Sequence, residues 1–65
     1  MMPGAKVKEL RLKHNWSQDD LADRISVTRQ YIAAIEAGRK PLSLAAANDC
    51  AKAFGCSIEV FVEGL

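Results

Sequence analysis

Hydrophobic residues recur at helical spacing along most of this chain. Near the N-terminus, Val7, Leu10, Arg11 and His14 fall at positions i, i+3, i+4 and i+7, which is one face of a helix. No segment of useful length alternates as a strand does. The pattern therefore predicts an all-α protein in which a single domain, residues 1–65, forms a compact five-helix bundle. The expected helices span residues 5–14, 18–25, 29–37, 44–54 and 58–62.

Capping signals mark the ends of these helices. Ser17 followed by Asp20 fits a capping box, with a hydroxyl at the N-cap and a carboxylate three residues later. The same kind of residue precedes three later helices, at Thr28, Ser43 and Ser57. Residues that favour a left-handed conformation end three helices, at Asn15, Gly38 and Gly55. Trp16 and Leu21 have the spacing of a hydrophobic staple, so we expect Trp16 in the core.

The third predicted helix has an unusual outer face. On a helical wheel its inner side carries Ile32, Ile35 and Glu36, and the opposite side carries Gln30, Ala33, Ala34 and Ala37, with Arg29 and Tyr31 on the flanks. The alanines would let the helix approach a surface closely, while Arg29 and Gln30 reach out from its first turn. The major groove of DNA admits such a helix, where Arg can pair with guanine and Gln with adenine. A solvated surface would carry the same residue types.

The connection before this helix favours the DNA interpretation. Only Ser26 and Val27 separate the second helix from the cap of the third, which is the helix-turn-helix layout. The stretch "WSQDDLADRISVTRQYIAAIEAGRKPLSLAAANDCAKAFGCSIEVF" resembles the Cro/C1-type (XRE) family of helix-turn-helix domains. The resemblance runs from about Val7 to Phe61. Its most specific part is the pattern S-Q-x-x-L-A-x-x-x-x-V-[ST]-R-Q-x-I-x-x-I-E-x-G.

The resemblance implies a phage-repressor-like (lambda-repressor-like) bundle that binds operators as a dimer and usually represses transcription. It implies base-reading roles for Arg29, Gln30 and Ala34, and the outward Ala33 could pack its methyl group against a thymine methyl. It also implies phosphate contacts for four residues: Gln18, Tyr31, Arg39 and Lys40. Gln18 would in addition brace the recognition helix. Arg39 and Lys40 are cations in a loop, and generic loop solubility would also account for them.

Several positions bear on stability. Arg11 and Glu36 both fall on buried helix faces, so we expect them to form an ion pair, and the family has a similar pair. Ser26 stands where the family commonly has glycine, which predicts either a strained left-handed turn or an altered turn. Ala46 and Asn48 stand where similar proteins often carry larger apolar residues. The core would then be thinner, or part of the fourth helix would be open to a partner.

The charge distribution and the composition limit the classes of function further. Residues 1–40 hold eight Lys and Arg against five acids (+3), and residues 41–65 hold one against three (−2). A basic first half suits a polyanion, although an ordinary mixed surface explains it as well. We expect no enzyme, because no second histidine, paired carboxylates or glycine-rich phosphate loop occurs. We likewise expect no cofactor, no metal site at Cys50, Cys56 and His14, no disulfide, no membrane span and a cytoplasmic location.

The sequence therefore favours a regulator that binds double-stranded DNA. The main hypothesis is a repressor that acts as a homodimer on a two-fold symmetric operator. The C-terminal segment supplies three apolar candidates for the dimer contact, Val60, Val62 and Leu65. The alternative is an antitoxin or a restriction-modification controller, whose main partner would be another protein or its own operon.

Overall fold

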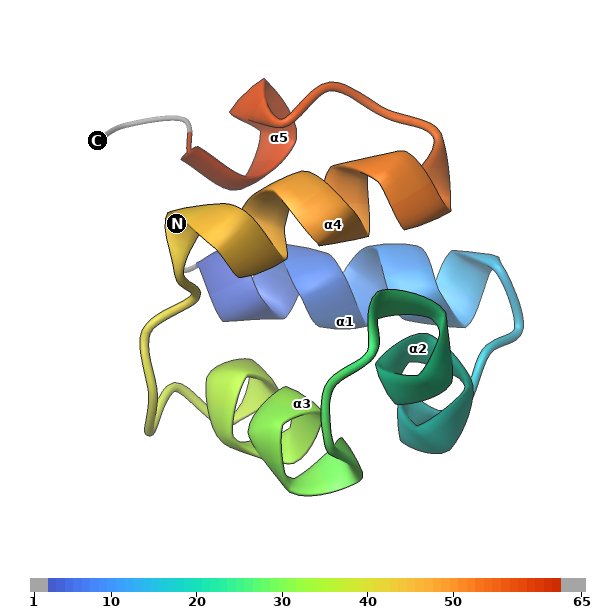
Figure 1. Ribbon diagram of the computed structural model, residues 1–65, viewed down its shortest axis with the longest axis vertical. Helices are drawn as coiled ribbons and strands as arrows, with labels where there is room; N and C mark the ends of the chain where they lie inside the picture. The colour runs from blue at the N-terminus through green and yellow to red at the C-terminus, as the bar shows by residue number, and fades with distance from the viewer. Residues whose placement is uncertain (1–2, 63–65) are drawn as a thin grey trace.

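The computed structural model describes residues 3–62, which fold into five helices without a strand. The helices are α1 (Pro3–Lys13), α2 (Gln18–Ile25), α3 (Arg29–Glu36), α4 (Leu44–Phe54) and α5 (Glu59–Val62). In Figure 1, α1 and α4 run side by side through the middle of the bundle, α5 lies above them, and α2 and α3 lie below. The all-α, five-helix prediction is confirmed.

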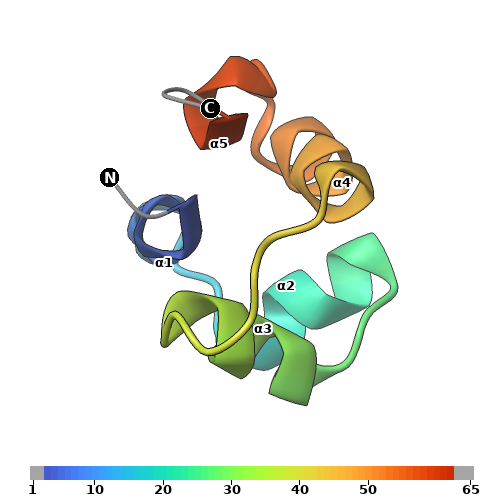
Figure 2. The ribbon, with the colours of Figure 1, turned by 90° about the vertical axis from the view of Figure 1, so that its left-hand side faces the viewer.

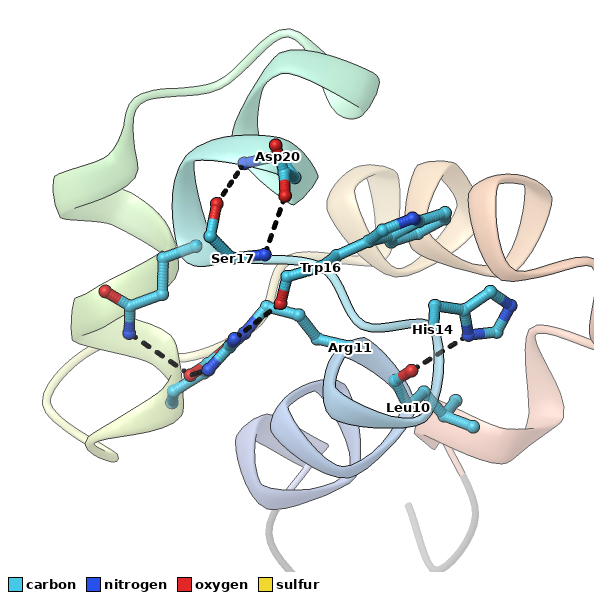
Figure 3. Close-up of polar contacts among 8 residues, drawn as sticks. Leu10, Arg11, His14, Trp16, Ser17 and Asp20 are labelled. Carbon is cyan, nitrogen blue, oxygen red and sulfur yellow. Dashed lines mark hydrogen bonds and ion pairs between the residues drawn. The ribbon is translucent and has the colours of Figure 1, made fainter.

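Side-chain caps begin α2, α3 and α4 as the sequence predicts. In the capping box of α2, the Asp20 backbone N–H donates to Ser17 Oγ at 3.0 Å, and the Ser17 N–H donates to Asp20 Oδ2 at 2.9 Å (Figure 3). Thr28 and Ser43 accept from the third residue of α3 and of α4, at 3.1 Å each. Each bond satisfies a backbone donor that the helix itself leaves free.

Four residues at helix ends have the positive φ angles that a chain reversal needs: Asn15 (57°), Ser26 (59°), Gly38 (77°) and Gly55 (70°). Ser26 is the costly one, because a serine side chain gains less from this conformation than asparagine does and lacks the freedom of glycine. The strained turn expected at Ser26 is therefore present in the structure.

The helix bounds differ from expectation at four places. Helix α1 starts at Pro3 rather than residue 5 and ends at Lys13 rather than residue 14, α3 ends one residue early, and α5 starts one residue late. Pro3 suits a first helical turn because its fixed φ is helical and its missing N–H would have no partner there. Gly4 is buried, and a Cβ at this position would collide with the carbonyl oxygen of Ile35. The early start thus brings α1 into backbone contact with α3.

One hydrophobic core joins all five helices. Its largest fully buried side chains come from the first four of them: Val7, Leu21, Ile32, Ile35 and Cys50. Phe61 of α5 closes the core from the other side. Figure 2 shows α1 between α5 and the α2–α3 pair. Val7 of α1 belongs to this core.

Trp16 lies at the edge of this core rather than inside it. Its ring is half-buried and stacks on Phe54, with 5.4 Å between ring centroids. The Arg24 guanidinium carbon lies 4.1 Å from the Trp16 ring centroid, and the His14 ring centroid lies 4.7 Å from it. Trp16 thus packs against the core as expected, but at its edge, where the Arg24 cation can cover the outer part of the ring.

Helix α4 carries the two small or polar residues that depart from the family pattern. Ala46 is buried and Asn48 is exposed. Ala46 also lines an open cleft of about 600 Å³ between the α2–α3 turn and the start of α4. The part of α4 next to the turn is therefore hollowed rather than filled by a large side chain.

Candidate nucleic-acid interface

Helices α2 and α3 form a tightly connected pair. The Val27 N–H donates to the carbonyl of Ala22 at 3.0 Å, and left-handed Ser26 reverses the chain. Leu21 and Ile25 of α2 and Ile32 of α3 all enter the common core. The outer side of α3 lies at the lower end of the bundle, away from α1 (Figure 1). The geometry is that of a helix-turn-helix, in which the second helix is free to enter a groove.

The start of α3 presents the two polar residues that sequence reasoning selected. Arg29 and Gln30 are exposed, whereas Ile32 and Ile35 are buried. Ala33 and Ala34 are half-buried, so their small side chains leave the helix backbone close to the surface. The exposed first turn followed by small residues could fit against base edges in a major groove.

Arg29 is already engaged in the free protein. Its Nε lies 3.8 Å from Oδ1 of Asp19, a pair in which the Arg29 side chain is 59% exposed and the Asp19 side chain 75% exposed. Asp19 was not among the site residues predicted from the sequence. No local pattern marks this pairing, because the tight turn joins the end of α2 to the start of α3, and Asp19 comes close to Arg29 only through the angle at which the two helices cross.

Gln18 faces the other end of α3. Its Nε2 donates to Glu36 Oε1 at 3.2 Å, so it ties the start of α2 to the last residue of the recognition helix. Gln18 is half-buried, and its predicted phosphate contact stays a prediction.

A three-helix polar network holds this arrangement. Arg11 on α1 donates from Nε to Glu36 Oε2 at 2.8 Å and from Nη2 to Oε1 at 3.0 Å, and its Nη1 donates to the Trp16 carbonyl at 2.8 Å (Figure 3). The hydrogen bond with Glu36 raises the pKa of Arg11, and the Glu36 charge adds to it against the effect of burial. Glu36 Oε1 thus accepts from Arg11 and from Gln18, which fixes α3 against both α1 and α2.

The loop after α3 carries the predicted phosphate-binding cations. Arg39 and Lys40 are exposed, and within residues 3–62 neither forms an ion pair. Lys40 Nζ lies 5.6 Å from the centroid of the half-buried Tyr31 ring, whose hydroxyl accepts from the Ser43 N–H at 3.5 Å. Tyr31 and Lys40 therefore lie together beside the start of α4.

The described part of the chain offers little else in the way of chemistry. Between residues 3 and 62, no three His, Cys, Asp or Glu side chains lie close enough to hold a metal ion together. Both cysteines are free thiols, and burial raises the pKa of Cys50 to about 11. The helices in this range are also too short and too polar for any of them to cross a bilayer.

Helices α2 and α3 are joined by a tight turn, the first turn of α3 is exposed, and two cations follow the end of α3. These features are those of a helix-turn-helix domain that binds DNA. A family model described as "Helix-turn-helix" matches residues 7–61, and the chain belongs to this Cro/C1-type family. This confirms the family resemblance that the sequence motif carries.

Curated relatives agree with this assignment. The chain is 48% identical over 54 residues to an uncharacterized HTH-type transcriptional regulator of Methanocaldococcus jannaschii, covering 83% of this chain and 82% of the relative. It is 46% identical over 54 residues to one of Bacillus subtilis, with the same coverage. It is 39% identical over 54 residues to one of Archaeoglobus fulgidus, covering 83% and 76%. The family is therefore one of DNA-binding transcriptional regulators.

Proposed function

We propose that this protein is a sequence-specific repressor that reads double-stranded DNA with α3 and acts in the cytoplasm. The observation that carries the proposal is the exposed Arg29–Gln30 pair on the first turn of α3. Glu36 holds this helix in place through hydrogen bonds with Arg11 and Gln18. A rigid helix with two long polar side chains at its exposed end suits base reading, because the contacts need fixed positions to discriminate. Occupation of an operator would then block transcription.

Each predicted residue has a separate part in this proposal. Gln30 pairs with adenine and Arg29 with guanine, while the methyl groups of Ala33 and Ala34 pack against the groove floor and thymine methyls. Four residues hold the phosphates on either side: Gln18, Tyr31, Arg39 and Lys40. The exposure of Arg39 and Lys40, and the absence of an ion pair for either in the described range, support this role, since an unpaired cation is free to release DNA counterions.

The test is a binding selection from randomised duplexes at physiological salt, with wild type and Arg29→Ala/Gln30→Ala in parallel. We expect the wild type to enrich a two-fold symmetric site and the double variant to enrich none, although both proteins fold. Salt-sensitive binding without enrichment by the wild type would overturn the proposal. It would also direct the search toward a protein partner.

We also propose that a homodimer binds the two halves of that site. Of the predicted contact residues, Val60 and Val62 are half-buried, and Leu65 lies outside the described residues. The more prominent apolar side chain is Leu44, which is 69% exposed. It borders a groove of about 290 Å³ whose walls are apolar: Pro3, Pro41, Leu42, Ala47, Phe61 and Val62. An exposed leucine beside an apolar groove suits a two-fold contact, because each copy can insert Leu44 into the groove of the other.

The groove also lies where a dimer could serve DNA reading. Its walls come from α1, the α3–α4 loop, α4 and α5. Helix α4 begins and this loop runs at the left of Figure 1. Helix α3 ends toward this side, so two copies joined here could set both α3 helices against one face of a duplex. Half-sites on that duplex would then be centred about 34 Å apart.

Two leucines provide a matched test of the dimer. Leu44 and Leu12 are the two exposed large hydrophobic residues of the described chain, and they lie on different helices. Leu44→Asp should shift sedimentation from dimer to monomer and weaken binding to the full site more than to a half-site. Leu12→Asp should change neither property. A wild-type protein that is monomeric both alone and on DNA would overturn the dimer proposal.

A further inference from the structure

Three polar side chains begin α2, and each meets a different partner. Gln18 donates to Glu36, and Asp20 closes the capping box with Ser17. Asp19 stands between them in sequence and pairs with Arg29 of α3. Within residues 3–62, Asp19 is thus the residue with which Arg29 forms an ion pair.

The geometry of the pair leaves the reading edge of Arg29 open. Asp19 Oδ1 approaches the Nε side of the guanidinium, at 3.8 Å. Among the described residues, neither terminal nitrogen of Arg29 forms a hydrogen bond. Guanine O6 and N7 can accept two parallel hydrogen bonds from the N–H groups on one edge of a guanidinium. A carboxylate at Nε thus limits the rotation of Arg29 without occupying the edge that would meet a base.

A purely structural role accounts poorly for Asp19. Exposed ion pairs contribute little to stability. The start of α2 already has its cap from Ser17 and Asp20, and Asp19 adds only a favourable charge near the helix N-terminus. On a surface that must approach phosphates, however, an exposed carboxylate carries a cost in affinity. Its placement there suggests a benefit in selectivity.

We propose that Asp19 is a positioning residue that makes Arg29 read guanine instead of gripping the DNA backbone. The proposal rests on the proposed function and adds to it a determinant of specificity on α2. Asp19 would orient the guanidinium from its Nε side and would repel phosphate oxygens that compete for it. The expected consequence is weaker binding to DNA in general and sharper discrimination at the base pair that Arg29 contacts.

The experiment compares Asp19→Asn with Asp23→Asn. Asp23 is a matched control because it is an exposed aspartate on the same helix and has no ion pair within residues 3–62. Dissociation constants are measured for the selected duplex and for the same duplex with the guanine replaced. Both variants should bind all DNA more tightly, since each loses a negative charge. Only Asp19→Asn should lose discrimination at that guanine, by about fivefold.

Asp19→Glu serves as the conservative variant and should restore most of the discrimination, because a glutamate can still reach Nε. Equal discrimination by Asp19→Asn and Asp23→Asn would overturn the inference and leave the proposed function intact. A wild-type protein that enriches no site would overturn both.

A second measurement tests the pair without DNA. The Arg29 Nε–H signal in a nitrogen-proton NMR spectrum should shift in Asp19→Asn and stay in place in Asp23→Asn. An unmoved signal in Asp19→Asn would overturn the positioning role, whatever the protein binds.

Discussion

Arg11 and Glu36 form a two-pronged ion pair between α1 and α3, with side chains only 9% and 4% exposed. The pair is the charged centre of the bundle, and within the described residues every buried side-chain nitrogen and oxygen has a partner. Because Glu36 is the last residue of α3, the same carboxylate that stabilises the fold also fixes the angle of the recognition helix.

Removal of one partner should therefore be far more harmful than removal of both. Glu36→Ala leaves the Arg11 guanidinium buried without a counter-charge, at a cost of about 3–5 kcal/mol in the free energy of unfolding. The double variant Arg11→Met/Glu36→Leu should lose much less, since no charge is stranded. Urea denaturation measures both. A Glu36→Ala loss below about 1 kcal/mol would show that the pair behaves as an exposed one.

Ser26→Gly should stabilise the protein. The left-handed backbone at Ser26, with φ 59°, costs a non-glycine residue roughly 1–2 kcal/mol, and glycine removes this strain while adding freedom to the unfolded chain. We expect a net gain of about 0.5–1 kcal/mol in thermal or urea unfolding. Asn15→Gly is the comparison at another left-handed position, where asparagine is already tolerated, so its gain should be smaller. A Ser26→Gly variant less stable than wild type would contradict the strain.

Gly4→Ala should destabilise the protein through the contact between α1 and α3. The added methyl group would meet the Ile35 carbonyl, which is backbone and cannot swing away. Overpacking of this kind costs typically about 1–3 kcal/mol, although alanine is the better helix former. Gly55→Ala provides a contrast, because nothing lies within 4 Å of its added Cβ and only its positive φ opposes the change. An unchanged melting temperature for Gly4→Ala would place the helices further apart than the structure does.

Acid should weaken the capping box of α2. The backbone N–H of Ser17, and then its hydroxyl, lower the pKa of Asp20 from its ordinary value of 3.8. A carboxyl group with a lowered folded pKa stabilises the protein above its unfolded pKa, and this contribution is lost as the pH falls through the folded pKa. The stability difference between wild type and Asp20→Asn should therefore be present at neutral pH and shrink below about pH 4. A difference with Asp20→Asn that stays constant to pH 2 would contradict this, and Asp23→Asn controls for general charge.

Local signals carried most of the fold prediction. The caps at Ser17, Thr28 and Ser43 are set by residues within four positions of one another, so they can be read without tertiary information. The bounds observed for α2 and α4 coincide with those expected from these signals. The side of α3 that carries Ile32 and Ile35 could likewise be inferred from helical period alone.

The rest depended on how distant segments meet. The early start of α1 reflects the approach of Gly4 to α3, 31 positions away in sequence, which no local pattern encodes. The pairing of Asp19 with Arg29 requires the crossing of α2 and α3, and the edge position of Trp16 follows from its stack on Phe54 of α4. These contacts are set by packing, and the site residue that was missed, Asp19, belongs to this class.

The most direct test of base reading by α3 is the discrimination of Gln30→Ala on the selected duplex. Affinities are compared for that duplex and for versions altered at one base pair per half-site, across a range of salt concentrations. If α3 reads bases, Gln30→Ala should lose about 1–3 kcal/mol of discrimination at one position and keep the salt slope of the wild type. Arg39→Ala should instead weaken binding to every duplex and reduce the slope by about one. Equal discrimination by Gln30→Ala and wild type at every position would contradict base reading by Gln30 of α3.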